Sequence, residues 1–193
     1  MKQLILKNHE DRRIRDGHLW IFSNEVDTKK SPLHAFTKGE NVDVVSSTMT
    51  SLGTGTINPN TLITCRLHAR TPNTPLTKEL IAKRIAEALH FRERSFASPY
   101  YRLLHGEGDF LPGLIIDRYD THLTVQITTY AMEMQKEVIC DVLAELLHPK
   151  SIRFANNLPT RSLEGLDTTS QCVGDVPYET VVQENGCTFR VPI

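Results

Sequence analysis

Short apolar runs alternating with turn signals fill the first 70 residues of the chain. Between the runs, Gly53, Gly55 and the Asn58-Pro59 pair indicate turns. Many short strands within 70 residues favour a small, partly open β-barrel, and the single tryptophan, Trp20, is expected in its core. The pattern predicts a short helix at 9–17, ending at Gly17, and strands at 3–6, 19–22, 42–46 and 61–68.

The rest of the chain changes between helical and strand-like spacing. Apolar positions three or four apart predict a basic helix that starts at Thr77 and a second helix over 131–147, which His148-Pro149 stops. The Asn185-Gly186 dipeptide between alternating apolar residues predicts a final hairpin. Strands are expected at 101–105, 114–119, 122–128 and 151–155, with the second and third joined as a hairpin through Asp120-Thr121.

These elements predict an α+β fold in which a helix packs on a sheet after the barrel. The prolines of residues 71–76 indicate a linker with few hydrogen bonds, which a protease should cut first. The expected division is therefore a barrel at 1–70, the linker at 71–76, a central α/β domain at 77–182 and a hairpin at 183–193.

Composition places the chain among ordinary globular proteins and separates its two halves by charge. Of 193 residues, 39% are hydrophobic and 23% charged, and no apolar run approaches the roughly 18 residues of a membrane helix. The first apolar run is also too short for a signal peptide, so a cytoplasmic protein with free thiols at its four cysteines is expected. Residues 1–105 carry 16 Lys+Arg and 10 Asp+Glu, whereas 106–193 carry 6 and 13. Such asymmetry is typical of a polyanion-binding half, although surface variation can also produce it.

The motifs of nucleotide and metal chemistry are weak in this sequence. The segment GEGDFLPG at 106–113 is glycine-rich, but the strand-like LIIDRY follows it instead of the helix that a phosphate loop needs. His105, Glu107 and Asp109 alternate and could face one way on a strand as metal ligands, yet pairing with nearby charges is the simpler explanation. We therefore assign no catalytic, cofactor-binding or metal-binding residue.

A dense basic group is the more specific signal. It lies around the short helix and just before Trp20, and a basic helix beside a barrel edge can follow a phosphate backbone. The candidate RNA-binding residues are Lys7, Arg12, Arg13, Arg15 and His18, joined by Arg66 and Arg70 on the strand expected to close the barrel.

The segment DGHLWIFSNEV at 16–26 resembles the G-H-P-W-(V/I)-F-S signature of the PUA domain in bacterial rRNA cytosine-C5 methyltransferases that use S-adenosylmethionine, with Leu19 in place of Pro. GTINPNTLITCRLHAR at 55–70 is similar to the end of that domain. YRLLHGEGDFLPGLIIDRYDTHLTVQ at 101–126 resembles the family's R-L-(I/V)-x-x-E-(A/S)-D-G-L-P-G-L segment, with Phe110 where the pattern has Gly.

Two further segments extend the resemblance toward the end of the chain. NNLPTRSLEGL at 156–166 is similar to R-S-D-x-x-x-R-x-x-E-G-L, with Asn156 and Asn157 near the Arg and Asp positions. ENGCTFRVPI at 184–193 resembles the segment that leads into the Rossmann-like methyltransferase domain of the family.

The resemblance implies a PUA-like barrel and a central domain, with the catalytic domain and its S-adenosylmethionine site missing from this chain. A shortened chain, a natural fragment and a decayed paralogue remain open. The function it implies is the RNA-recognition portion of an rRNA methyltransferase, with no cofactor in this chain and ribosomal RNA as the partner. A stand-alone RNA-binding module without catalysis is the alternative, and a small enzyme built on the His105 group is a third reading. A free sheet edge also leaves room for a homodimer.

Overall fold

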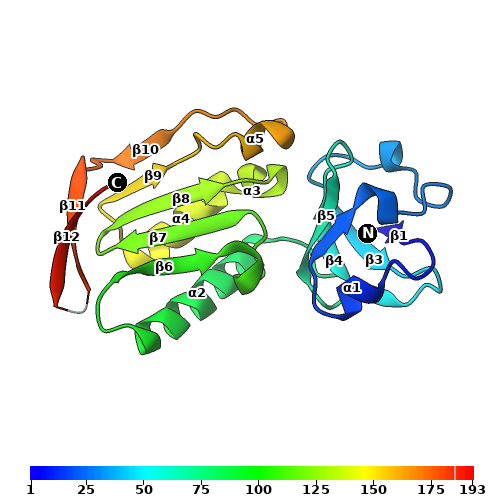
Figure 1. The fold of residues 1–193 in the computed structure, drawn as a ribbon, viewed down its shortest axis with the longest axis horizontal. Coiled ribbons are helices and arrows are strands. Elements are labelled where there is room, and N and C mark those ends of the chain that lie inside the picture. Colours follow the sequence, from blue (N-terminus) through cyan, green and yellow to red (C-terminus); the bar gives the residue numbers. More distant parts are fainter. Residues whose placement is uncertain (185) are drawn as a thin grey trace. The chain divides into compact units, whose positions relative to one another are not determined.

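The computed structural model describes residues 1–184 and 186–193, which form two compact units, Met1–Thr77 and Lys78–Ile193 (Figure 1). The predicted α+β class is confirmed, since both units combine sheets with helices. Asn185, half of the predicted Asn-Gly turn, lies outside the described residues, but strands β11 (Glu179–Glu184) and β12 (Cys187–Pro192) on either side of it pair as an antiparallel hairpin.

The first unit is built on one five-stranded sheet with the order β1-β3-β4-β5-β2. β1 and β3 are parallel, and the other pairs are antiparallel. The backbone after β2 returns to β1: an isolated bridge joins Leu6 to Val26, and the Lys7 N–H donates to the Glu25 carbonyl at 2.9 Å. This return brings the two edges of the sheet together, as the predicted barrel requires. The strands are β1 (Lys2–Ile5), β2 (Trp20–Phe22), β3 (Asn41–Val45), β4 (Ser51–Ile57) and β5 (Ile63–Ala69).

Strand β4 is the main element that the sequence pattern did not predict. Its two glycines indicated turns, but they lie inside the strand, where β5 passes very close. A Cβ at Gly55 would lie 2.6 Å from the Arg66 carbonyl oxygen, and one at Gly53 would clash with the Ala69 carbonyl. The glycines therefore permit close backbone approach instead of ending a strand.

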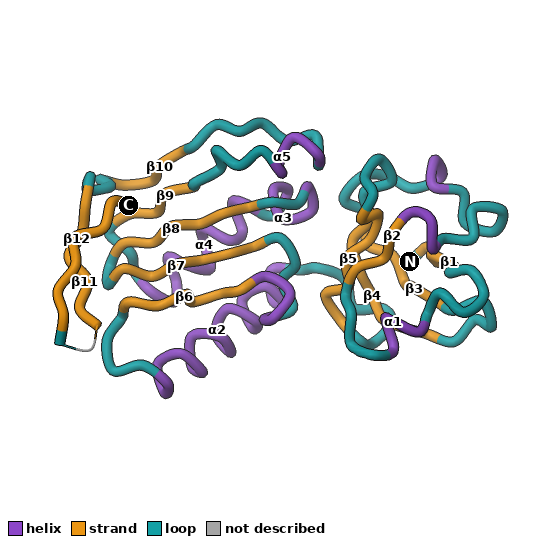
Figure 2. Tube along the Cα trace, viewed as in Figure 1, coloured by secondary structure: helices purple, strands orange, loops and turns teal. Residues whose placement is uncertain are grey.

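The second unit is a five-stranded sheet, ordered β10-β9-β8-β7-β6, with helices α2 and α4 in contact with each other (Figures 1 and 2). The side chains of Ile81, Ile116, Val125, Ile139 and Phe154 are completely buried in its core. The sheet strands are β6 (Tyr100–His105), β7 (Leu114–Tyr119), β8 (His122–Ile127), β9 (Ser151–Phe154) and β10 (Gln171–Gly174). The helices are α2 (Lys78–Ser95), α3 (Tyr130–Met134), α4 (Lys136–Leu147) and α5 (Thr160–Leu163).

Three local expectations differ from the structure of the second unit. The single helix expected at 131–147 is two helices, because Gln135 leaves the helical conformation between α3 and α4. Strand β10 and helix α5 were not expected, since neither has a long apolar pattern. The HGEGD segment is a 3-10 helix, Gly106–Asp109, so His105, Glu107 and Asp109 do not alternate on a strand as the metal reading assumed.

Residues 71–76 make more hydrogen bonds than the expected linker would. The Asn73 N–H donates to Asp43 at 2.9 Å, and the Leu76 N–H donates to the Asn41 side chain at the same distance. Thr54 Oγ1 bonds both Asp43 and the Thr71 carbonyl, and Leu76 is 7% exposed. The segment is thus held on the first unit, and the boundary between the two units follows Thr77.

The close approach of β4 and β5 predicts a cost for adding a methyl group between them. We expect Gly55→Ala to lower the free energy of unfolding by about 1–3 kcal/mol, because the Cβ would press on the Arg66 carbonyl and the buried Cys65 sulfur. Urea denaturation followed by the fluorescence of the single tryptophan reports this unit. Thr56→Ala, at the next and half-buried position, is the control. Equal midpoints for both variants would contradict the packing argument.

Candidate functional site

The seven predicted RNA-binding residues all lie in the first unit, and the structure divides them by what they contact. One group is tied to the backbone or to a buried carboxylate, and the other presents its charge to solvent. Exposure alone does not separate the two groups. Lys7, Arg12, Arg15, His18 and Arg70 are exposed and Arg13 and Arg66 are half-buried, but Lys7 and Arg70 also donate to backbone carbonyls.

Arg13 contacts groups within the protein, a role that its position in the basic group of the sequence did not indicate. Its guanidinium lies 2.9 Å from Glu25, a carboxylate whose side chain is only 7% exposed, and it also donates to the Trp20 carbonyl at 3.2 Å. The same group stacks over the Phe22 ring, 5.0 Å from the ring centre. Removing Arg13 would therefore leave a buried carboxylate without its charged partner, which is costly.

Arg70 is also committed to the backbone. It donates to the Ile14 carbonyl at 2.8 Å and to the Gly17 carbonyl at 2.5 Å, so it bonds carbonyls at and just beyond the end of helix α1 (Arg12–Arg15). Cations are favoured at this end because helix carbonyls there lack partners within the helix. Arg70 thus fastens α1 to β5.

Arg12, Arg15 and His18 form what we call the basic surface. All three side chains are exposed, and they come from α1 and the turn that follows it. Arg15 pairs with Asp11 at 2.6 Å on the helix surface, where such pairs contribute little to stability. These three residues fit the predicted role best, because contact with a phosphate would not remove any buried interaction.

Trp20 is exposed, contrary to the expectation that it lies in the core. Its neighbours Leu19 and Ile21 are 8% and 0% exposed, whereas Trp20 is 39% exposed, as strand alternation requires. It pairs across the sheet with Arg66. The alternation of this strand was the signal that could have revealed the outward-facing ring. Its neighbour Arg66 follows only from the pairing of the strands.

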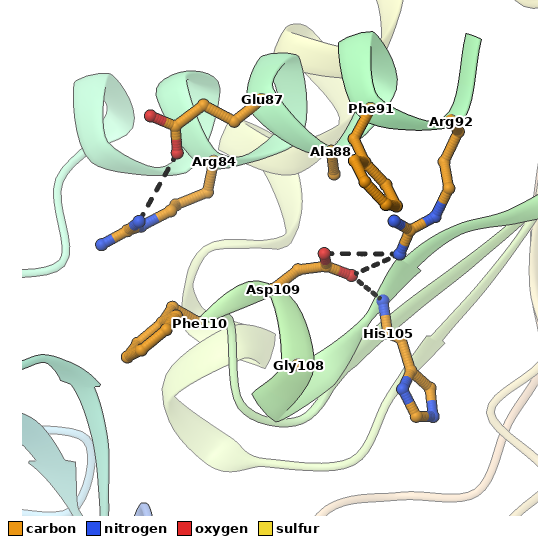
Figure 3. Close-up of a pocket in the computed structure, with 9 residues that line it drawn as sticks. All are labelled: Arg84, Glu87, Ala88, Phe91, Arg92, His105, Gly108, Asp109 and Phe110. Carbon is orange, nitrogen blue, oxygen red and sulfur yellow. Dashed lines mark hydrogen bonds and ion pairs between the residues drawn. The ribbon is translucent and has the colours of Figure 1, made fainter. Parts of the chain in front are cut away.

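A second candidate site, here called the α2 pocket, lies in the second unit. It is a cavity of about 420 Å³ between α2 and the 3-10 helix Gly106–Asp109. Figure 3 shows Arg84, Phe91 and Arg92 reaching from α2 toward Asp109 and Phe110. The sequence pattern predicted a basic helix here but not the partners of its charges, because Asp109 and Phe110 lie in a distant loop.

An ion pair in the α2 pocket joins α2 to the 3-10 helix Gly106–Asp109. Arg92 Nη2 lies 3.1 Å from Asp109 Oδ2, and both side chains are only 16% exposed. Arg92 Nε donates to the Arg102 carbonyl at 3.0 Å, and Asp109 accepts the His105 backbone N–H at 2.6 Å. The carboxylate that had been considered as a metal ligand is thus occupied by an arginine and a backbone amide.

Metal ligation and thiol chemistry find little support among the described residues. Residues 1–184 and 186–193 contain no cluster of three or more His, Cys, Asp or Glu that could hold a metal ion. Burial raises the pKa of the Cys65 thiol to about 12, so it stays protonated near neutral pH and is a poor nucleophile. Burial likewise raises the pKa of Cys140.

Residues 4–70 match the family model of the PUA-like domain, so the first unit contains a PUA-like domain. Ribosomal RNA large subunit methyltransferase I of Tolumonas auensis is 30% identical over 194 residues, which cover 97% of this chain and 48% of that protein. The protein of that name from Shewanella amazonensis is 31% identical over 194 residues, with the same coverages.

Two solved structures share the fold at 16% sequence identity. A Streptococcus mutans protein assigned to the SAM-dependent methyltransferases has a TM-score of 0.77, covering 100% of this chain and 49% of that one. SMU.776, assigned as a methyltransferase and solved with SAH, has a TM-score of 0.79, with coverages of 100% and 48%. The chain is therefore homologous to rRNA methyltransferases and spans about half the length of the curated relatives it matches.

No helix within residues 1–184 and 186–193 combines the length and apolar character needed to cross a membrane.

The ion pair of the α2 pocket can be tested by removing its carboxylate. We expect Asp109→Ala to lower the free energy of unfolding by about 1–3 kcal/mol, since Arg92 and the His105 amide would lose a largely buried acceptor. The measurement is chemical denaturation followed by far-ultraviolet circular dichroism. Asp141→Ala, at an exposed position of α4, is the control. A loss no greater than that of the control would show that the pair does not hold this loop.

Proposed function

We propose that this chain is the RNA-recognition portion of an S-adenosylmethionine-dependent rRNA methyltransferase acting in the cytoplasm. The observation that carries the proposal is the basic surface on the unit that matches a PUA-like domain. The named relatives act on large-subunit ribosomal RNA, which fits a polyanionic partner. Modification at cytosine C5 is the finer part of the proposal, and it rests on the motif resemblance alone.

The physical basis is attraction between exposed cations and phosphates. Arg12, Arg15 and His18 project from one helix and its turn, so they can follow successive phosphates of a folded RNA. Structured RNA is recognised largely by shape and backbone, because its deep major groove excludes side chains. Each cation that contacts a phosphate releases counterions, so binding should weaken as salt rises.

The alternative is an RNA-binding module that takes no part in methylation. Both readings share the RNA contact, and the difference lies in the methyl donor. S-adenosylmethionine sites of the Rossmann type place a glycine-rich turn between a strand and a helix. In the described part of the chain, the glycine-rich segment 106–113 leads into β7 instead. These residues do not fit the cofactor, and we derive no methyl-transfer step from them.

The basic surface makes RNA binding depend on salt. We expect Arg12→Gln/Arg15→Gln to weaken binding to structured rRNA fragments and to reduce the slope of log K against log salt by about 1.5, close to two phosphate contacts. Fluorescence anisotropy at several salt concentrations measures both effects. Arg13 is left intact because it partners the buried Glu25.

A matched control removes the same charge from the acidic half. Arg190 is 76% exposed at its side chain and Lys150 is exposed, so Lys150→Gln/Arg190→Gln should leave the slope almost unchanged. The fully buried Arg161 is not suitable as a control position, because it bonds the Asp167 and Ile127 carbonyls and its removal would disturb the core. Equal slope changes in both double variants, or no RNA binding by the parent chain at low salt, would refute the proposed interface.

A separate prediction concerns the methyl donor. We expect isothermal titration calorimetry of the 193-residue chain with S-adenosylmethionine to show no binding in the micromolar range, because the described residues offer no glycine-rich turn before a helix. S-adenosylhomocysteine should behave in the same way. Saturable micromolar heat with either compound would overturn this prediction and place a cofactor site in the chain itself.

A further inference from the structure

The α2 pocket combines an exposed aromatic ring with a guanidinium that has unused donors. Phe91 is 61% exposed and projects from α2 into the pocket (Figure 3). An exposed phenylalanine face can stack with a nucleobase of any type, because every base has a π-face. The volume of about 420 Å³ falls in the usual range for small-ligand sites.

Phe110, at the other end of the pocket, adopts a conformation that is unusual for its residue type. Its φ of 56° and ψ of 30° lie in the left-handed region, which disfavours residues that have a Cβ. The strained backbone carries the ring to the Arg84 guanidinium, 5.1 Å from the ring centre. Strain of this kind is more often found where a side chain serves binding.

Arg84 retains hydrogen-bonding capacity. Its Nη1 donates to Glu87 at 3.5 Å, a long and weak bond, and its Nε is buried without a hydrogen-bond partner among the described residues. Arg92, by contrast, is engaged by Asp109, by a backbone carbonyl and by the Phe91 ring, whose centre lies 5.1 Å from its guanidinium carbon. An anionic oxygen that entered the pocket would therefore be attracted to Arg84, which the Phe110 ring holds in place.

We propose that the α2 pocket receives one unpaired nucleotide of an RNA. The base stacks on Phe91, and the phosphate lies at the Arg84 end, with Phe110 as the positioning residue for Arg84. This inference rests on the proposed function, because it assumes that the chain binds RNA. The α2 pocket would add to the basic surface a second RNA contact, in the second unit, and this contact would distinguish an unpaired nucleotide from a paired one.

The test compares two RNAs with the same stem. One is a hairpin with 2-aminopurine in its unpaired loop, and the other is the stem closed as a duplex without unpaired nucleotides. For the parent chain we expect tighter binding to the hairpin and quenching of the 2-aminopurine fluorescence, since stacking on an aromatic ring alters that fluorescence. Phe91→Ala should abolish the quenching and weaken hairpin binding about 5- to 150-fold, the range that corresponds to one stacked base.

Phe110→Gly tests the positioning role without relying on a destabilised protein. Glycine adopts the left-handed conformation without strain, which offsets part of the packing lost with the half-buried ring, so the melting temperature should change little. Hairpin affinity should nevertheless fall, with a shallower salt dependence, because Arg84 loses the ring that holds it. Tyr178→Ala removes an aromatic ring that is 87% exposed and lies outside the pocket, and it should match the parent.

The outcomes separate this inference from the proposed function. If Phe91→Ala and Phe110→Gly bind the hairpin as the parent does, or if the parent does not prefer the hairpin over the duplex, the pocket is not a nucleotide site, while duplex binding would still support the basic surface. If the parent binds neither RNA at low salt, the proposed function itself fails, and this inference fails with it.

Discussion

The ion pair between Arg92 and Asp109 determines the shape of the second unit around its pocket. It joins α2 to the 3-10 helix after β6, and its partners reach the Arg102 carbonyl and the His105 amide on that strand. Both side chains are largely buried, so separating them would leave a charge without compensation. Because these bonds join α2, β6 and the 3-10 helix, the backbone at Phe110 is held in its strained conformation, and the ring faces Arg84. The pocket therefore depends on an interaction between positions 17 residues apart in the sequence.

The first unit uses its cations in two different ways. Arg13 and Arg70 bind a buried carboxylate and backbone carbonyls, and they hold α1 and β2 on the sheet. Arg12 and Arg15 remain at the surface of the same short helix. Arg13 and Arg70, through these bonds, thus position Arg12 and Arg15. A polyanion bound at the basic surface would meet side chains on a helix that these bonds already fasten to the sheet, which reduces the entropy lost on binding.

Strands with clear alternation could be predicted from the sequence, and elements defined by distant partners could not. β7 and β8 match their predicted ranges to within one residue, because apolar and polar positions alternate around the Asp120-Thr121 turn. β4 was missed because Gly53 and Gly55 signal turns locally, and only the passage of β5 shows why they are needed. For the candidate site, the basic cluster was visible in the sequence, whereas the roles of its members follow from tertiary contacts.

The central claim is that RNA contacts the basic surface of the PUA-like unit. Amide chemical-shift mapping of the ¹⁵N-labelled chain, titrated with a structured rRNA fragment at low salt, tests it most directly. The account predicts progressive shifts at α1, the following turn to His18, and the β2–β5 pair around Trp20. Shifts confined to the outer hairpin β11–β12 or to β10, with none around α1, would contradict it.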